Sequence, residues 1–197
     1  MVTARAAPEG YIYDIIQIMN KKERVAILID GSNMYHYIKG LGLDPKIQFD
    51  YKKFGEFLAR GRQIVSATYY IGKIRANQSK QSQHLRANQQ RLMAWLTKCG
   101  WAMEFGHMLE NGGVFHEKGV DVHMASDLLR GAYKDFYDTA ILVTSDTDLI
   151  PAIRYVREER KKLEYIGFSY RPSYGLIKFS DDRTLLKKED IAQFFPA

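Results

Sequence analysis

Short apolar segments alternate with amphipathic segments along most of this chain, and this alternation restricts its fold more than any other feature. Residues 24–30 (RVAILID) and 138–145 (DTAILVTS) have the length and the branched side chains of strands that are buried on both faces. Segments with apolar residues at helical spacing lie between the strand-like segments. Because strands that alternate with helices favour a parallel sheet covered by helices on both faces, the sequence predicts an α/β fold.

The remaining segments extend this pattern over nearly the whole chain. Further strands are expected at 63–72, 101–108 and 162–168, with a short sixth strand at 177–180. Helices are expected at 32–39, 50–60, 77–99, 122–135 and 148–160, with a leading helix at 11–20 and a short helix or extended clasp at the end of the chain. We expect a helical extension at 1–22, one domain at 23–180 and an extension at 181–197 that packs on that domain.

Composition excludes several classes of protein. The 197 residues are 46% apolar and 26% charged, which is enough apolar material for one buried core. No apolar run has transmembrane length, and the first ten residues lack the apolar core of a signal peptide. Because Cys99 is the single cysteine, no intrachain disulfide can form, and we expect a cytoplasmic protein with no membrane contact.

Positive charge is concentrated in one part of the chain. The net charge is +6, and residues 57–103 contain eight Lys or Arg residues and no Asp or Glu. The rest of the chain holds all 23 acidic residues and is slightly acidic overall. Two interpretations stay open for this basic segment: a surface for the phosphate backbone of a nucleic acid, or a solvated helix face.

Four aspartates follow the expected strands at junctions between elements: Asp30, Asp121, Asp146 and Asp148. Ligands of parallel sheets bind outside the carboxyl ends of the strands, so these side chains are expected to converge there. Carboxylates held together repel one another unless a cation neutralises them, and hard oxygen ligands suit Mg²⁺ or Mn²⁺. Helix capping is the alternative for Asp121 and Asp146, and a helix-dipole contact is the alternative for Asp148. Asp30 ends a buried strand, and we expect no capping role for it.

Other candidate sites have weaker support. In the helix expected at 122–135 the predicted buried face consists of Val122, Ala125, Leu128, Leu129 and Ala132. Asp127 falls nearly opposite this face, which favours an exposed surface acid. None of the five histidines has a partner at zinc-ligand spacing, and the glycines at 112 and 113 are not followed by the GK[ST] of a Walker loop.

Three motifs identify a family when they are taken together. ILIDGSNMYH, KGVDVHMASDLL and TAILVTSDTDLIPAI occur in this order within roughly residues 24–168. They resemble the NYN domain family of the LabA-like type, in the PIN-like ribonuclease superfamily. The resemblance implies a Rossmann-like three-layer α/β/α sandwich, with a mostly parallel sheet of five or six strands, and a metal-dependent ribonuclease. The matching positions are Asp30 and Asn33 in the first motif, Lys118 and Asp121 in the second, and Asp146 and Asp148 in the third. Family members also tend to have an acid at the position of Asp127.

We therefore expect endonucleolytic hydrolysis of single-stranded RNA with Mg²⁺ or Mn²⁺ as cofactor and no organic cofactor. The expected metal ligands and catalytic residues are Asp30, Asp121, Asp146 and Asp148. The expected RNA-binding residues are Ser32, Asn33, Lys118, Ser145, Arg75, Lys80, Arg86 and Arg91, with Tyr35 and Tyr70 as candidates for base stacking. RNA is the expected partner, and a homodimer is left open.

Two other functions are weighed against this one. The chain could be a non-catalytic RNA-binding or regulatory module on the same fold. A phosphatase or a DNA nuclease could use the same metal centre. Phosphatases of the haloacid-dehalogenase kind need a second aspartate two residues after the first, and Ser32 stands there instead.

Overall fold

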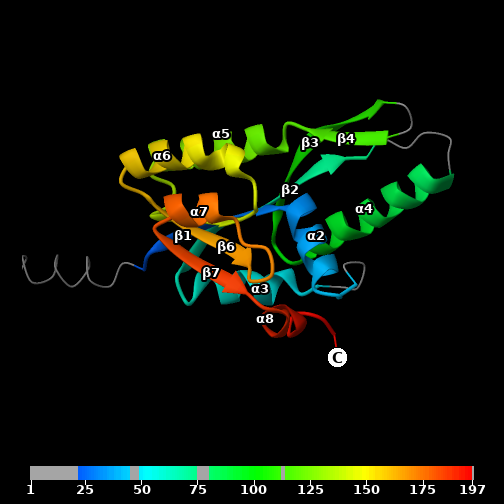
Figure 1. Cartoon of the computed structure of the whole chain (residues 1–197), viewed down its shortest axis with the longest axis horizontal. Coiled ribbons are helices and arrows are strands. Elements are labelled where there is room, and N and C mark those ends of the chain that lie inside the picture. The colour runs from blue at the N-terminus through cyan, green and yellow to red at the C-terminus, as the bar shows by residue number, and fades with distance from the viewer. Residues whose placement is uncertain (1–21, 45–48, 75–79, 112–113, 197) are drawn as a thin grey trace, which may run out of the picture.

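The computed structural model describes residues 22–44, 49–74, 80–111 and 114–196 (Figure 1). The helix expected at 11–20 and the candidate Arg75 lie outside these ranges.

Seven strands form a single sheet in the described part of the chain, in the order β4-β3-β2-β1-β5-β6-β7. Six of them are parallel, which confirms the predicted sheet, and β4 adds an antiparallel edge strand that the sequence analysis did not predict. The strands are β1 (Arg24–Asp30), β2 (Gln63–Lys73), β3 (Ala102–Asn111), β4 (Val114–Lys118), β5 (Thr139–Val143), β6 (Lys162–Phe168) and β7 (Asp182–Leu186).

Helices cover both faces of this sheet, so the predicted three-layer α/β/α sandwich is confirmed (Figure 1). Side chains of α2, α3, α4 and α8 join the core on one face, and side chains of α5, α6 and α7 join the core on the other. The helices are α2 (Gly31–Gly40), α3 (Tyr51–Ala59), α4 (Lys80–Lys98), α5 (Val120–Tyr133), α6 (Ile150–Glu158), α7 (Tyr174–Phe179) and α8 (Lys188–Ala192), with a short 3-10 helix η1 (Thr147–Leu149).

Strand β1 shows why its apolar run is continuous. Val25, Ile27 and Ile29 pack into the core under α2 and α3. Ala26 and Leu28 point to the opposite face and pack into the core under α5 and α6. Since successive side chains of a strand point to opposite faces, a strand covered on both sides needs apolar residues at every position.

The chain end differs from the prediction. Residues 177–180 do not form a strand, because most of this segment is the last part of α7, the helix that crosses from β6 to β7. A short apolar run fits either structure, and the parallel pairing of β6 with β7 requires a crossover between them. The sheet continues past the expected domain boundary at residue 180, because β7 begins at Asp182.

The strand order places the usual ligand-binding position of such folds at the centre of the sheet. The chain adds β2 and β3 on one side of β1, then returns to add β5, β6 and β7 on the other side. The connections that leave the carboxyl ends of β1 and β5 therefore diverge to opposite faces, which is the usual ligand position of such folds. No helix in the described ranges is both long and apolar enough to span a membrane.

Candidate active site

Asp30 is the last residue of β1 and also the N-cap of α2. Its carboxylate accepts a hydrogen bond from the backbone N–H of Asn33 (3.0 Å) and another from the Asn33 side-chain amide. The prediction that Asp30 has no capping role is therefore wrong. Strand and helix follow each other without an intervening loop, so the residue that ends the strand must cap the helix.

Thr144 links Asp30 to the end of β5. The register pairs Ile29 with Val143, so the next residues of the two strands meet at the edge of the sheet. The buried hydroxyl of Thr144 donates to the Asp30 carboxylate (3.1 Å) and accepts from the backbone N–H of Asp146 (3.1 Å). Sequence analysis missed Thr144; its signal was a hydroxyl directly after an apolar strand that neighbours β1.

Asn33 and Ser145 complete this network. The side-chain carbonyl of Asn33 accepts hydrogen bonds from the backbone N–H (3.3 Å) and the hydroxyl of Ser145. Asn33 thus holds the Asp30 carboxylate with its amide group and the end of β5 with its carbonyl. Two expected RNA-binding residues therefore lie in the hydrogen-bond network of Asp30.

Of the four candidate aspartates, the structure brings Asp30 and Asp146 together. The negative charge of Asp146 is close enough to affect the ionisation of Asp30. Asp148 is exposed in η1, and its backbone N–H donates to the Asp146 carboxylate (2.9 Å), so Asp146 caps this short helix. Asp121 lies half-buried in the first turn of α5 and is not its N-cap, which is Gly119. Among the described residues, no three acidic, histidine or cysteine side chains are close enough to hold a metal ion together. The four-carboxylate centre stays a prediction.

The environment of Asp30 is costly for a negative charge. Its side chain is only 7% exposed, and burial raises the pKa of the carboxyl above its ordinary value. Hydrogen bonds from Asn33 and Thr144 oppose this rise, whereas the charge of Asp146 adds to it. Within the described ranges no Lys or Arg forms an ion pair with Asp30.

The donor set fits a hard divalent cation. The hydroxyl of Thr144 and the amide oxygen of Asn33 are already engaged in hydrogen bonds, so the oxygens that could hold the cation are those of the Asp30 and Asp146 carboxylates. Mg²⁺ is usually bound through one or two carboxylates plus substrate phosphates. Glycine at position 31 lets the start of α2 lie close to β2, because a Cβ there would lie only 2.8 Å from the carbonyl oxygen of Tyr70. Ser32 is exposed beside it in the first turn of α2, and Lys118 is exposed at the end of β4.

Asp127 is not the surface acid that the sequence predicted. Its carboxylate accepts a hydrogen bond from the hydroxyl of Tyr70 (2.9 Å), and it lines a recess between α5 and the sheet. The predicted buried face of α5 included Val122 and Leu129, but both side chains are exposed. The buried face therefore lies further round the helix than predicted. Tyr70 itself is buried, so the prediction that it stacks on RNA bases is wrong. Burial, with the charge of Asp127, raises the pKa of Tyr70 far above its ordinary value.

The basic segment 57–103 divides into two parts that lie at opposite ends of β2. Arg62 pairs with Glu164 and Glu23, and Arg60 pairs with Asp182, at the amino end of the strand. The other part is α4, whose Gln89 side chain donates to the carbonyl of Gly72 (2.6 Å) and accepts from the N–H of Ile74 (2.9 Å). This contact fixes α4 to the carboxyl end of β2. Three exposed candidate RNA-binding residues lie on this helix: Lys80, Arg86 and Arg91.

The Arg62–Glu164 pair leads to a stability prediction. Arg62→Gln should lower the free energy of unfolding by about 3 kcal/mol, because it leaves the carboxylate of Glu164 nearly buried without its partner. Glu164 is 8% exposed and holds the guanidinium of Arg62 through contacts of 2.5 and 2.9 Å. Arg60→Gln is the control, since its ion pair is exposed and should contribute less than about 1 kcal/mol. Urea unfolding measures the free energy of unfolding of both variants. Equal losses would show that the buried pair stabilises the protein no more than the exposed pair does.

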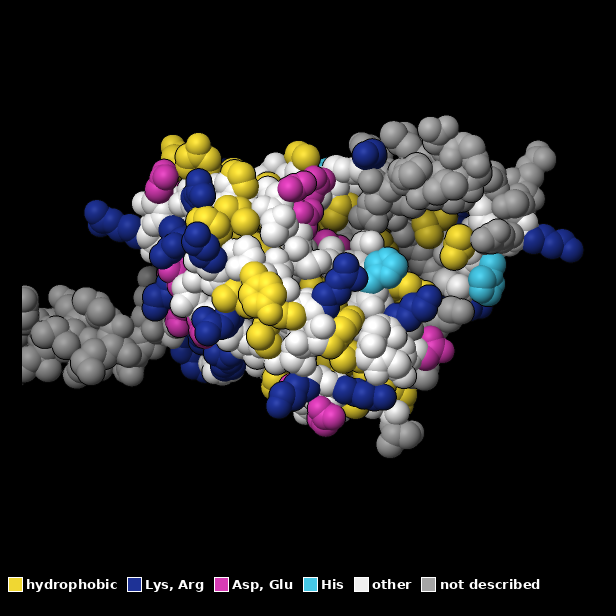
Figure 2. Space-filling model, viewed as in Figure 1, with side chains coloured by type: hydrophobic (Ala, Val, Ile, Leu, Met, Phe, Trp, Pro, Cys, Tyr) yellow, Lys and Arg dark blue, Asp and Glu magenta, His cyan; other side chains and the backbone are white. Residues whose placement is uncertain are grey.

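Acidic side chains gather on the face between α5 and α2, beside Lys, Arg and His side chains (Figure 2). This face of the molecule therefore carries both signs of charge.

The sequence profile of the NYN domain matches residues 24–185, which include β1 to β6 and all but the last residue of β7. The chain belongs to the NYN domain family. NYN domains have the fold of PIN-like nucleases, in agreement with the motifs and the parallel sheet of this chain.

Two similar proteins extend the comparison. The uncharacterized protein MJ0482 of Methanocaldococcus jannaschii is 30% identical over 170 residues, which are 86% of this chain and 58% of that protein. This NYN protein thus spans little more than half the length of that relative. The crystal structure of VPA0982, a protein of unknown function from Vibrio parahaemolyticus, superposes with a TM-score of 0.66 at 22% identity. It covers 87% of this chain and 97% of its own chain, which shows a shared fold.

Proposed function

We propose that this NYN protein is a metal-dependent ribonuclease that hydrolyses phosphodiester bonds within single-stranded RNA. The observation that carries the proposal is the buried Asp30 carboxylate, which lies beside Asp146 at the switch point of the sheet and has no Lys or Arg partner among the described residues. Two carboxylates in such a position favour a bound cation, and oxygen ligands suit Mg²⁺ or Mn²⁺.

Each residue has a role in this proposal. Asp30 and Asp146 hold the ion, and Asp121 and Asp148 complete its surroundings directly or through water. Asn33 and Thr144 orient the Asp30 carboxylate through the hydrogen bonds described above. A bound divalent ion lowers the pKa of a water molecule and offsets charge on the phosphodiester. Ser32 and Lys118 are exposed at the same edge of the sheet, where they can contact RNA phosphates.

The direct test is cleavage of a labelled single-stranded RNA with Mn²⁺ and with EDTA. We expect internal cleavage with Mn²⁺, products that carry a 5′-phosphate, and no cleavage with EDTA. Cleavage that persists in EDTA, or products with 2′,3′-cyclic phosphates, would contradict a hydrolytic metal site.

Metal binding should also stabilise the protein. At a Mn²⁺ concentration about 100 times its dissociation constant, the melting temperature should rise by roughly 5–10 °C, since a ligand that binds the folded state alone adds about 2.7 kcal/mol. Asp146→Asn should lose most of this rise. Differential scanning fluorimetry measures both proteins, and an unchanged rise in the variant would count against Asp146 as a ligand.

A non-catalytic RNA-binding module is the second candidate function. It is favoured by the observation that no three candidate ligands are gathered in the described residues. RNA binding without cleavage in Mn²⁺ would select this candidate.

In either case we propose a cytoplasmic location, in keeping with the single free thiol of Cys99.

A further inference from the structure

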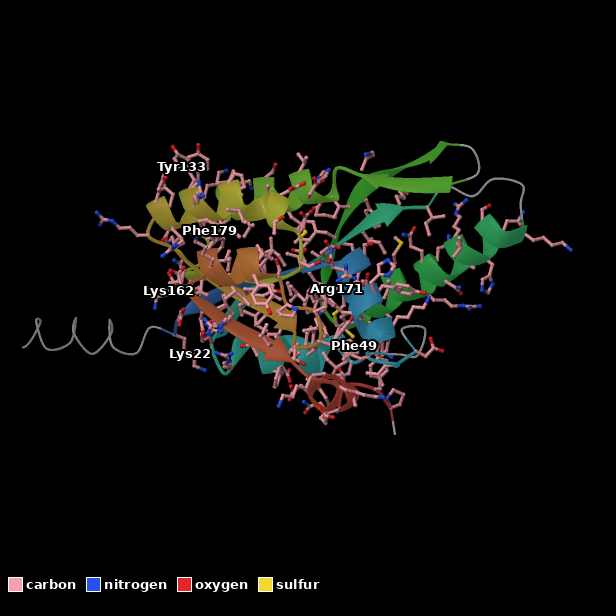
Figure 3. The ribbon with its side chains drawn as sticks, in the orientation of Figure 1. Lys22, Phe49, Tyr133, Lys162, Arg171 and Phe179 are labelled. Atoms are coloured by element: carbon pink, nitrogen blue, oxygen red, sulfur yellow. The ribbon has the colours of Figure 1, made fainter. Side chains whose placement is uncertain are left out.

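The turn after β6 passes over α2 close to the Asp30 network. The hydroxyl of Tyr170 donates to the backbone carbonyl of Tyr37 (3.1 Å), and the N–H of Arg171 donates to the carbonyl of Phe168 (3.0 Å). The ring of Tyr37 stacks on that of Phe168, with centroids 4.2 Å apart. These contacts fix Arg171 at the carboxyl end of β6, the strand next to β5 (Figure 3).

The hydroxyl of Tyr37 has no hydrogen-bond partner in the described part of the chain, although the residue is only 4% exposed. Ser145 and Tyr165 are the polar neighbours of this hydroxyl and both affect its ionisation. The Tyr37 hydroxyl nevertheless makes no hydrogen bond of normal geometry with either of them. The hydroxyl of Tyr165 already accepts from the N–H of Ser173 (3.0 Å). Burial raises the pKa of Tyr37 to about 12, so this hydroxyl is an unused donor at neutral pH.

Ser145 connects this donor to the candidate active site. Asn33 and Tyr37 lie one turn apart on α2, and Ser145 is a neighbour of both. The Ser145 hydroxyl and N–H both donate to the same carbonyl oxygen of Asn33. The hydroxyl can therefore turn to another acceptor while the N–H keeps the contact with Asn33.

Arg171 supplies a free positive charge at the same place. Its side chain is exposed, and it forms no ion pair with any described residue. The guanidinium is close enough to favour ionisation of the Tyr37 and Tyr170 hydroxyls, against the larger opposing effect of their burial. A guanidinium binds a phosphate with two parallel hydrogen bonds.

We propose that Arg171 and Ser145 form a phosphate-binding subsite beside the Asp30–Asp146 pair, with Tyr37 as a positioning residue behind Ser145. The subsite binds an RNA phosphate next to the one that is cleaved, and in this respect it rests on the proposed function. A polyanion that approaches two carboxylates needs a cation nearby, and Arg171 provides it. When the Ser145 hydroxyl turns toward the phosphate, its oxygen becomes an acceptor for the unused Tyr37 hydroxyl.

The test compares Arg171→Gln with Lys162→Gln, which removes the same charge from the opposite end of β6 (Figure 3). Fluorescence anisotropy measures binding of a fluorescein-labelled single-stranded RNA in EDTA, where no metal-dependent cleavage occurs. We expect about tenfold weaker binding for Arg171→Gln and a salt slope reduced by about 0.7, against less than about twofold for Lys162→Gln. Equal effects of the two variants would overturn the subsite.

Tyr37→Phe tests the positioning role with two measurements. Removal of an unpaired buried hydroxyl should raise the melting temperature of the RNA-free protein, whereas RNA binding should weaken about threefold. A purely structural residue would not move these two quantities in opposite directions. Unchanged binding, or a lower melting temperature, would contradict the role.

The outcomes separate this subsite from the proposed function. If Arg171→Gln binds RNA like the unaltered protein while Asp30→Asn loses cleavage, the subsite is wrong and the nuclease stands. If the unaltered protein does not cleave RNA but its RNA binding depends on Arg171, the nuclease is wrong and the phosphate subsite stands.

Discussion

Asp30→Asn should lower the rate of RNA cleavage by about 10³-fold and leave the fold intact. A carboxylate that holds the ion contributes several kcal/mol of transition-state stabilisation, and about 4 kcal/mol corresponds to this factor. The asparagine keeps a side-chain oxygen for the N–H of Asn33, so the cap of α2 can persist without the charge. Single-turnover cleavage of labelled RNA in Mn²⁺ measures the rate, and circular dichroism checks the fold.

Asp50→Asn is the matched control. Asp50 is also an N-cap aspartate, which accepts from the N–H of Lys53 (3.0 Å) at the start of α3. Both substitutions weaken a cap, but only Asp30 belongs to the candidate active site, so Asp50→Asn should cleave at nearly the unaltered rate. Equal losses in the two variants would assign the effect of Asp30→Asn to a weakened cap.

The basic residues of α4 should control the affinity for RNA. Replacing Lys80, Arg86 and Arg91 together with Gln should reduce the salt slope of RNA binding by about 2 and weaken binding by about 100-fold at 0.1 M salt, since each single-strand phosphate contact contributes about 0.7 to the slope. The loss should be similar for different RNA sequences, because phosphate contacts carry no base information. Cleavage of bound RNA should change much less, because these side chains are exposed on α4 and are not proposed metal ligands.

A second triple variant controls for net charge. Lys134, Lys162 and Arg183 are exposed near the amino ends of the strands, and their replacement with Gln removes the same three charges. We expect only a small, sequence-independent loss of affinity from this variant. If both triple variants bind alike, the cations of α4 form a solvated helix face and RNA follows another path.

The sheet and the central aspartate pair could be predicted from the sequence. The apolar runs of β1 and β5 predict strands that are buried on both faces. The polar residues of the candidate site follow directly after each run. Strand alternation then predicts that the carboxyl ends of parallel strands share one edge, which brings Asp30 and Asp146 together. The motifs predict Asn33 and Ser145 as RNA-binding residues; the structure places both in the hydrogen-bond network of Asp30, and their contact with RNA stays a prediction.

The errors have a common cause, which is that tertiary contacts decide where local patterns are ambiguous. Val122 and Leu129 are apolar yet exposed, so the apolar pattern of α5 predicts the wrong buried face. For this reason the contact of Asp127 with Tyr70 could not be predicted. The apolar run in α7 fits a strand as well as a helix. Thr144 acts through a hydrogen bond across two strands, which no spacing within one segment reveals.

The basic segment shows the same limit for charge. Its residues are continuous in sequence, but Arg62 lies at the amino end of β2 in an ion pair, whereas α4 is fixed to the carboxyl end. Positive charge in a sequence predicts an attraction for RNA only where the fold leaves the side chain without an acidic partner.

A crystal structure with Mn²⁺, analysed by its anomalous scattering, tests the central claim most directly. The claim is that Asp30 and Asp146 hold a divalent ion at the switch point of the sheet. We expect an anomalous peak within coordination distance of a carboxylate oxygen of each aspartate. A Mn²⁺-saturated crystal with no peak between these two carboxylates would contradict the claim.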